Sequence, residues 1–454
     1  MPTVAPARGE GASRSRRATL GGASTARDAA VWLALVAAGA ALTVLAVRLR
    51  APLHSQGVPF IGFYRWRLRP ATGLAAAVAV VVVVAVRRGV PERLPVGWLL
   101  LASYCSAAVW SLALALVDGR AGLAGPLATA PGYLSDVATV DDPASYLRHF
   151  VARAGDYSVE TRQHPPAPVL LLWTLRQVGV SRPTTLGVLI TLVGCLTVPL
   201  VAVSVRSLCG AASARRLVPV LALAPYAVWV AVSMDAVTMT LTAAALTCGV
   251  VASEPRRSGW WAATGGVLLG MAALFSYSAG WLAVSLILVY FVRRRPLLNV
   301  ATGVGALVPL AVVRAAGFVW PNGLTAAQAD ISQGVGAHRS WLIWAVLDVF
   351  VLLLAAGPSI VPAGRKMRRT PGWPFLVGAG LAVAFALAFR LSRGEVERSW
   401  LPFYPWLLVA CVAPERRPAA GDPTAADSAP TPVLLVILGA LAAITIVTVV
   451  RTAW

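Results

Sequence analysis

Apolar runs of about 15 to 22 residues recur along the whole chain, and runs of this length predict transmembrane helices. Repeated runs with polar punctuation exclude a soluble globular domain, and they exclude a β-barrel, whose strands would alternate. The sequence therefore predicts an all-α polytopic membrane protein. We count about 13 spans, at 30–47, 72–87, 96–117, 184–205, 217–233, 235–252, 259–276, 278–292, 298–316, 341–357, 373–390, 400–413 and 432–450.

The charges of the chain are strongly basic, with a formal net charge of +21. Nucleic-acid binding is one interpretation. The basic residues lie between the apolar runs, however, and Lys and Arg concentrate in the cytoplasmic loops of membrane proteins. We therefore expect the lipid bilayer and no nucleic acid as a partner. The five cysteines have no close pairing, so they indicate neither a metal site nor a disulfide framework.

The loop charges also predict sidedness. Basic clusters follow alternate spans only if 166–180 lies along the outer interface as an amphipathic helix. The expected organisation is then a disordered cytoplasmic tail (1–29), three N-terminal transmembrane helices (30–117), an extracytoplasmic loop with interfacial helices (118–183), a transmembrane core (184–414), a cytoplasmic linker (415–431) and a last transmembrane helix (432–454).

One basic segment breaks this rule, because 48–71 carries five arginines on the expected outer face of a plasma-membrane protein. Its arginines could snorkel toward the phosphates of surrounding lipids. Alternatively, the segment could form a docking surface for a lipid-linked anion. The sequence leaves both interpretations open.

The outer loop 118–183 contains adjacent carboxylates, Asp141 and Asp142. Paired carboxylates can act as a general base with its orienting partner, or can hold a divalent cation. Asp142 precedes Pro143, which is also the pattern of a helix N-cap followed by N1. Asp136 is a further candidate for the base.

Three other groups could carry chemistry. His164-Pro165-Pro166 closes the acidic stretch, and Asp235 lies at the outer end of an apolar run, where it could cap the next span or support a site. Near the C-terminus, Glu395 and Glu397 precede Arg398, whose planar fork suits a phosphate. An internal Glu–Arg pair is the structural alternative.

In their order along the chain these pieces resemble GT-C type glycosyltransferases, in particular the branch of protein O-mannosyltransferases and lipid-A aminoarabinose transferases. The residues that carry the resemblance are Asp141-Asp142 with Tyr146, Gly155-Asp156-Tyr157, His164-Pro165-Pro166, Arg206 to Gly210 with Arg215-Arg216, Pro225, Asp235, and Arg398-Ser-Trp400-Leu401-Pro402-Phe-Tyr-Pro405. Three features depart from the family pattern: three spans precede the acidic loop instead of one, the second acid is Asp, and the loop 317–340 lacks a further domain.

The resemblance implies an inverting glycosyltransferase that moves a sugar from a polyprenyl-phosphate donor to an extracytoplasmic cell-envelope acceptor, whether glycan, lipid or protein. Asp141 or Asp142 would be the catalytic base. The substrate-binding residues would be Tyr146, His164, Asp235, Glu397 and Arg398, with Arg398 on the donor phosphate. No cofactor is certain, and a divalent cation is the candidate.

Two other functions remain open from the sequence. A lipid or solute transporter or flippase would place broken helices around charges at mid-depth, whereas the acids here gather outside. A non-catalytic membrane protein of envelope assembly could keep the fold without activity. No Gly-rich phosphate loop or βα pattern indicates a nucleotide-sugar enzyme.

Overall fold

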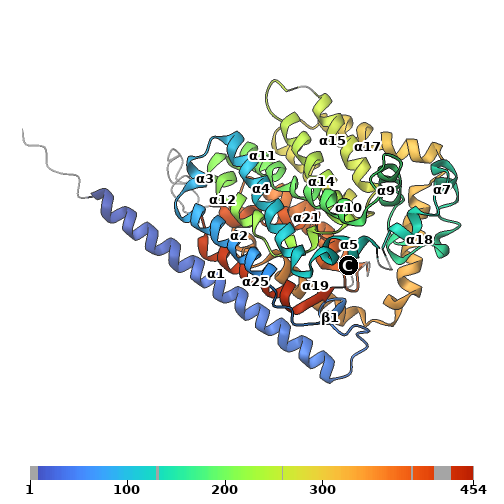
Figure 1. Cartoon of the computed structure of the whole chain (residues 1–454). Helices are drawn as coiled ribbons and strands as arrows, with labels where there is room; N and C mark the ends of the chain where they lie inside the picture. The colour runs from blue at the N-terminus through green and yellow to red at the C-terminus, as the bar shows by residue number, and fades with distance from the viewer. Residues whose placement is uncertain (1–8, 129–131, 258, 390–391, 414–430, 453–454) are drawn as a thin grey trace, which may run out of the picture.

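The computed structural model describes residues 9–128, 132–257, 259–389, 392–413 and 431–452 (Figure 1). Nearly all of its regular structure is helical. The helices of nine or more residues are α1 (Gly9–Arg48), α2 (Pro70–Arg87), α4 (Val96–Ala115), α5 (Arg120–Ala128), α9 (Ala167–Gln177), α10 (Pro183–Cys195), α11 (Thr197–Cys209), α12 (Ala211–Ala222), α14 (Met234–Ala252), α15 (Trp260–Ala273), α16 (Ala283–Val292), α17 (Leu298–Ala315), α18 (Trp320–Gln333), α19 (Trp341–Ala356), α21 (Trp373–Ala388) and α25 (Val433–Val449).

Short helices connect these elements. The short α-helices are α3 (Val90–Arg93), α6 (Leu134–Val137), α7 (Pro143–His149), α8 (Val159–Arg162), α13 (Ala227–Val230), α20 (Ile360–Lys366), α22 (Val396–Ser399) and α23 (Tyr404–Leu407). The 3₁₀ turns are η1 (Leu116–Asp118), η2 (Ala154–Asp156), η3 (Ala279–Leu282), η4 (Val335–His338), η5 (Met367–Arg369) and η6 (Val409–Val412).

The prediction of a helical polytopic membrane protein is confirmed, but the count of 13 spans is not. Six helices of the described residues are long and apolar enough to cross a membrane, or seven if the bent pair Trp341–Ala356 and Ile360–Arg369 is one span. Four shorter apolar helices accompany them: Trp260–Ala273, Ala279–Val292, Trp373–Ala388 and Val433–Val449.

Two of the predicted spans are broken by proline. The run 217–233 ends as α12 at Ala222, and Pro225 follows in the connector to α14. The run 400–413 folds into α23 and η6, because Pro402 and Pro405 interrupt regular helical hydrogen bonding. Both segments are uninterrupted apolar runs. Their composition alone therefore predicted transmembrane helices, which the backbone does not form.

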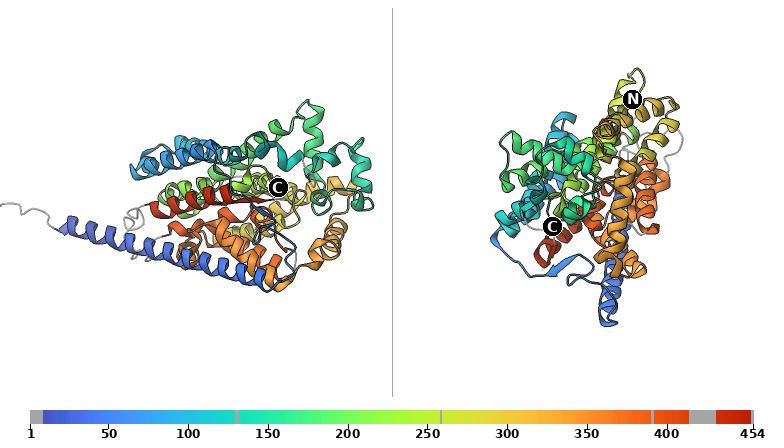
Figure 2. Two further views of the ribbon diagram at one scale, coloured as in Figure 1. Left: turned by 60° about the horizontal axis from the view of Figure 1, so that its bottom comes forward. Right: turned by 90° about the vertical axis from the view of Figure 1, so that its right-hand side faces the viewer.

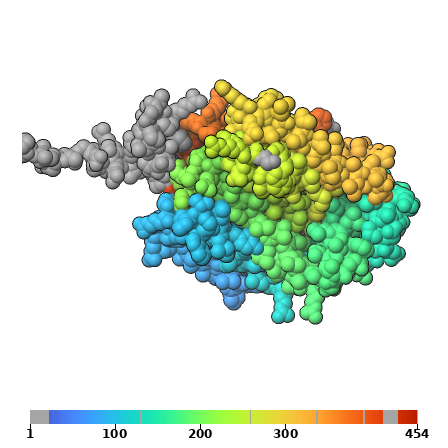
Figure 3. Space-filling model, turned by 90° about the horizontal axis from the view of Figure 1, so that it is seen from above, coloured from blue at the N-terminus to red at the C-terminus, as the bar shows by residue number. Residues whose placement is uncertain are grey.

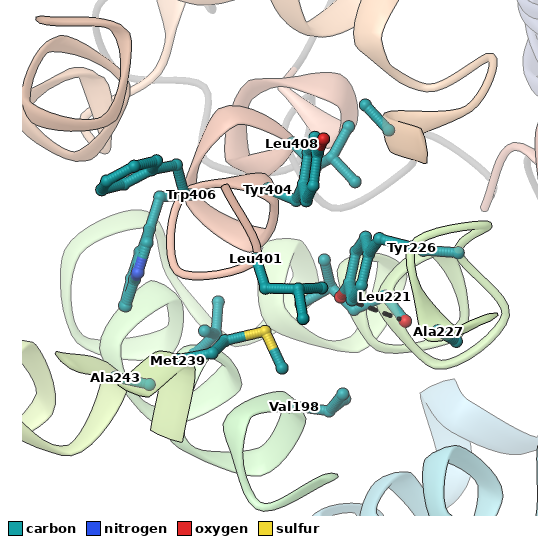
Figure 4. Close-up of a cluster of buried hydrophobic side chains, with 14 of the residues drawn as sticks. Val198, Leu221, Tyr226, Ala227, Met239, Ala243, Leu401, Tyr404, Trp406 and Leu408 are labelled. Carbon is teal, nitrogen blue, oxygen red and sulfur yellow. Dashed lines mark hydrogen bonds between the residues drawn. The ribbon is translucent and has the colours of Figure 1, made fainter. Parts of the chain in front are cut away.

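These two broken segments pack against each other in the centre of the protein (Figure 4). Tyr226 and Tyr404 stack with ring centroids 5.8 Å apart, and both rings are almost fully buried. Trp406 packs on Phe375 of α21, with ring centroids 4.6 Å apart. The packing fixes the segment after α22 against the connector before α14, and thereby brings residues near 398 and 235 together.

The loops fall into two groups at opposite ends of the helices. Basic loops contact one another at one end, where Arg215 donates to the carbonyl oxygen of Pro91 at 2.6 Å and Arg293 donates to that of Ser207 at 2.6 Å. Acid-bearing loops meet at the other end, where Arg162 pairs with Asp330 at 2.9 Å. This separation is the one that the charge pattern predicts.

The N-terminal helix lies along the outside of the bundle, against α19, α20 and α25 (Figure 2). Seen from above, the blue N-terminal part of the chain and the yellow part near residue 300 lie on opposite sides, with green segments between them (Figure 3). Helix α1 begins at Gly9, so much of the tail expected to be disordered over 1–29 shares this helix. Most of the linker expected at 415–431 lies outside the described residues.

The segment expected at 166–180 forms α9, whose eleven residues rise about 16 Å, half of the thickness of a bilayer core. Helix α9 is therefore too short to cross a membrane as a single helix, and its place along the outer interface stays a prediction.

The one sheet in the described residues joins segments almost 400 residues apart. Strand β1 (Gly62–Tyr64) pairs antiparallel with β2 (Val450–Thr452). Gly62 faces Thr452, and a Cβ at Gly62 would lie 2.1 Å from the carbonyl oxygen of Arg451, so only glycine allows this approach. The pairing continues as Arg65 and Arg67 donate their backbone N–H groups to the carbonyl oxygens of Val449 and Thr448.

Candidate functional site

The loop 118–183, which is predicted to be extracytoplasmic, is ordered by Asp136, whose side chain is buried. Its carboxylate accepts hydrogen bonds from the backbone N–H and the hydroxyl of Ser158, at 3.0 and 2.6 Å. Ser158 is in turn the N-cap of α8, since its hydroxyl accepts from the N–H of Thr161. Asp136 therefore fixes the start of the short helix that carries Glu160.

Arg398, on α22, is the centre of a buried cluster of carboxylates. Its Nη1 lies 2.5 Å from Oε2 of Glu160 and 3.4 Å from Oδ2 of Asp235, and its Nη2 lies 2.9 Å from Oε2 of Glu395. The side chains of Arg398, Glu160 and Asp235 are 5%, 7% and 2% exposed, whereas that of Glu395 is 28% exposed. Glu395 is thus the partner of Arg398 that solvent reaches.

His164 adjoins this cluster through Asp235. Its Nδ1–H donates to the carbonyl oxygen of Glu160 at 2.8 Å, which leaves Nε2 facing Oδ1 of Asp235 at 3.8 Å. Burial lowers the pKa of His164, but the carboxylates of Asp235 and Glu160 outweigh burial and raise the pKa above its usual value. Tyr133 packs edge-on against the imidazole, with centroids 6.1 Å apart.

Asp235 sits in the first turn of α14. Its backbone N–H donates to the hydroxyl of Ser233 at 3.0 Å, and that hydroxyl donates to Oδ2 of Asp235 at 3.1 Å. Ser233, rather than Asp235, is the N-cap, which corrects the sequence interpretation of Asp235 as the cap. A carboxylate in the first turn remains favourable because the helix N-terminus is the positive end of its dipole.

Glu397 lies beside Arg398 in sequence but does not join the cluster. It is 0% exposed, and neither of its carboxyl oxygens has a hydrogen-bond partner. Burial raises the pKa of Glu397 to about 8, so the group is mostly protonated at neutral pH. Of the two glutamates expected to orient Arg398, only Glu395 contacts it.

Asp141 and Asp142 are both exposed and lie outside the Arg398 cluster. Asp142 caps α7, as its pattern with Pro143 predicts: its carboxylate accepts from the N–H groups of Ala144 and Ser145 at 3.2 and 2.8 Å. Asp141 makes no side-chain hydrogen bond to any described residue.

Tyr146, which was predicted to bind substrate, also lies outside the Arg398 cluster. It packs within an aromatic cluster against Phe150 and Tyr157, at 5.5 and 5.6 Å.

The structure thus brings together Arg398, Asp235 and His164 from the predicted set, and adds Glu160 and Glu395. Sequence reasoning assigned Glu160 no role, although its position four residues before His164, on the same short loop, was the available signal. Arg398 and three carboxylates leave the cluster with an excess of negative charge, which a protonated His164 reduces. Among the described residues, no group of three or more His, Cys, Asp or Glu side chains is arranged to hold a metal ion.

Comparison with known proteins places part of this site in a family. Residues 163–319, about a third of the chain, match the model of the dolichyl-phosphate-mannose-protein mannosyltransferase family. A search of curated proteins gave no match.

Two solved structures of ArnT from Cupriavidus metallidurans are similar to the chain at 17% identity. The match to the apo structure covers 62% of this chain and 59% of the ArnT chain, with a TM-score of 0.38. The structure bound to undecaprenyl phosphate covers 71% and 61%, with a TM-score of 0.43. The chain therefore spans about 60% of the length of each ArnT chain that it matches.

The family match begins one residue before His164 and includes Asp235 and the spans from α10 to α17. Glu160 and Arg398 lie outside the matched range, and the tertiary structure brings them to Asp235 and His164. The resemblance predicted from the motif order is confirmed over the matched range, because residues 163–319 match the dolichyl-phosphate-mannose-protein mannosyltransferase family.

Proposed function

We propose that this protein is an inverting glycosyltransferase of the cell membrane that moves a sugar from a polyprenyl-phosphate donor to an extracytoplasmic envelope acceptor. The observation that carries the proposal is the buried cluster in which Arg398 meets Glu160, Asp235 and, through Asp235, His164. The matched family description names a dolichyl-phosphate sugar, which supports a polyprenyl phosphate as the donor class.

In the proposed reaction a carboxylate takes the proton of an acceptor hydroxyl, and the hydroxyl oxygen attacks the anomeric carbon of the donor. The bond from that carbon to the phosphate oxygen breaks, and the phosphate leaves with the electron pair. Attack from the face opposite the phosphate inverts the anomeric configuration. Arg398 and a protonated His164 would stabilise the negative charge that develops on the leaving phosphate.

Arg398 can take a phosphate only if it releases a carboxylate. Glu395 is the partner that the arrangement makes replaceable, because it is partly exposed and bonds a different guanidinium nitrogen from Glu160 and Asp235. A phosphate that displaced Glu395 would meet Nη2, while Nη1 stayed with Glu160. The guanidinium would thus keep its orientation during donor binding.

Two sets of carboxylates compete for the role of base. Asp141 lacks a hydrogen-bond partner among the described residues, so its oxygens are available to an acceptor, and Asp142 fixes the helix start beside it. Glu160 and Asp235 are paired with Arg398, so their oxygens are less available to an acceptor hydroxyl than those of Asp141. We therefore keep Asp141 as the proposed base.

The proposed sidedness puts the loop 118–165 outside the cell. A cysteine in place of Ala138, an exposed residue of this loop, should react with a membrane-impermeant reagent in intact cells when the native cysteines are replaced. A cysteine in place of exposed Arg88, at the basic end, should react only after lysis. The reverse pattern would refute the orientation.

The function is tested with the full chain in nanodiscs, a panel of radiolabelled polyprenyl-phosphate monosaccharides and an envelope extract as acceptor. Transfer of label from one donor to the extract, abolished in Arg398→Ala, is the expected result. Donor that crosses the bilayer in proteoliposomes but is never consumed would identify a flippase instead. The same donor panel with EDTA tests the divalent cation.

A further inference from the structure

A cavity of about 310 Å³ lies at the acid-bearing end of the helices, and all of its lining residues except Val228 and Ala231 precede or follow the family match. Arginines line it from two chain segments: Arg65, Arg67 and Arg69 come from the segment after β1, and Arg451 comes from β2. The pairing of β1 with β2 brings these segments together. A cavity of this volume is of the size that holds a small-molecule group.

Arg67 forms the floor of the cavity and is 5% exposed. Its guanidinium pairs with Asp118 and donates to the carbonyl oxygen of Val450, while its buried Nε has no hydrogen-bond partner. A buried guanidinium N–H without a partner is costly unless a ligand satisfies it. Arg67 thus lines the cavity and has one guanidinium N–H group without a hydrogen-bond partner.

The charges of the cavity do not balance. Among the described residues, Asp118 is the one carboxylate that lines the cavity, against four arginines. In the described part of the chain, Arg65, Arg69 and Arg451 have no ion-pair partner. The resulting excess of positive charge favours an anion with several oxygens, and the planar forks of arginine suit a phosphate.

The arginine segment alternates with apolar side chains that face away from the cavity. Tyr64, Trp66 and Leu68 are 55%, 74% and 73% exposed. Alternation is expected for an extended segment, whose successive side chains point to opposite sides. Aromatic and apolar side chains at the end of membrane helices lie in the lipid interface. Helix α2 begins at Pro70 and α25 ends at Val449, so this cavity opens at the ends of two apolar helices.

We propose that this cavity binds the phosphate group of a membrane lipid, with the lipid chain along the apolar helices that frame it. The inference does not rest on the proposed transferase function, because it uses none of the residues around Arg398. Two lining residues of the cavity, Val228 and Ala231, belong to the segment that precedes Asp235 in the chain.

The test is binding of lipid to the full chain in nanodiscs of zwitterionic lipid that contain a fluorescent polyprenyl phosphate or a fluorescent phosphatidylglycerol. Arg65→Gln with Arg69→Gln should weaken binding of one of these lipids about tenfold or more, which is the loss of one charge-assisted hydrogen bond or more. Arg48→Gln with Arg50→Gln is the matched control, because it removes the same charge from exposed positions in the same basic segment that do not line the cavity.

Equal losses in the two double variants would show diffuse electrostatic attraction and overturn the site, as would unchanged binding in Arg65→Gln with Arg69→Gln. Asp118→Asn keeps the shape and removes the one acid, so it should tighten binding several-fold; a purely structural cavity would not respond in this direction. Inorganic phosphate is the competitor that separates the sources. If it displaces the lipid at a concentration equal to that of the lipid itself, the site is for a free anion and the lipid assignment fails.

Discussion

Two buried arginines at the same end of the protein have opposite surroundings. Arg398 is contacted by three carboxylates, and Arg67 by one carboxylate within a group of four arginines. The first site has an excess of negative charge and the second an excess of positive charge. The comparison teaches that an arginine predicts a phosphate site only together with its neighbours: Arg67 is surrounded by charges that attract an anion, whereas Arg398 must first lose a carboxylate.

The largest expected difference between the two sites is the cost of removing the arginine. Arg398→Ala leaves Glu160 buried without its cation and Asp235 with only His164, so we expect the free energy of unfolding to fall by about 3–5 kcal/mol. Arg67→Ala leaves only Asp118, whose side chain is 28% exposed, and should cost about 1–2 kcal/mol. Thermal unfolding of both variants in the same detergent measures the difference. Equal costs would contradict the distinction.

Arg398→Lys sharpens this test, because it keeps the charge and loses the planar fork. If Arg398 binds the donor phosphate, this variant should stay folded while donor affinity falls. A purely structural Arg398 would show unchanged donor affinity in every folded variant.

The carboxylates provide the next largest effect. We expect Asp141→Asn to reduce transfer about 10²–10⁴-fold with stability unchanged, because it removes the proposed base from an exposed position. Asp142→Asn should cost much less, since asparagine also caps helices. If Asp141→Asn transfers normally and Asp235→Asn or Glu160→Gln does not, the base belongs to the Arg398 cluster.

The dependence of stability on pH should distinguish the two sites as well. The pKa of Glu397 in the folded protein, about 8, is above its usual value, so its stabilising contribution is complete below about pH 4.5 and is lost as pH rises to about 8. The raised pKa of His164 acts in the same direction from its usual value upward. We therefore expect stability to fall by a few kcal/mol between about pH 5 and 8.

Glu397→Gln removes the first of these contributions and should flatten the profile, so the variant should be more stable than the native protein at pH 9. Thermal unfolding over pH 5–9 measures it. Arg65→Gln, in the cavity, should leave the profile unchanged. A native profile that is flat, or that rises with pH, would contradict the assignment of a neutral, buried Glu397.

The smallest effect concerns Glu395. Glu395→Gln weakens the replaceable contact of Arg398 and should tighten donor binding several-fold, by making Nη2 easier to free. Binding of a polyprenyl-phosphate sugar in nanodiscs measures the change. Weaker binding would mean that Glu395 helps to hold the donor rather than competing with its phosphate.

Local patterns in the sequence determined the helical membrane class, the cap formed by Asp142, the short helix at 166–180 and the order of motifs that resembles GT-C enzymes. These features depend on neighbouring residues, because helix length, caps and hydrophobic runs are set within one or two turns. Proline was the local signal that was underused: Pro225 and Pro405 mark the two apolar runs that do not form spans.

Only the tertiary structure decided which charges meet. Arg398 reaches Glu160 across 238 positions, and Arg67 reaches the carbonyl oxygen of Val450 across 383. The sequence does not specify which charged residues pair, since every arginine expected on the outer side could pair with any carboxylate expected there. The stacking of Tyr226 on Tyr404 and the pairing of β1 with β2 select the partners, because packed rings and paired strands allow one arrangement while loop charges allow many.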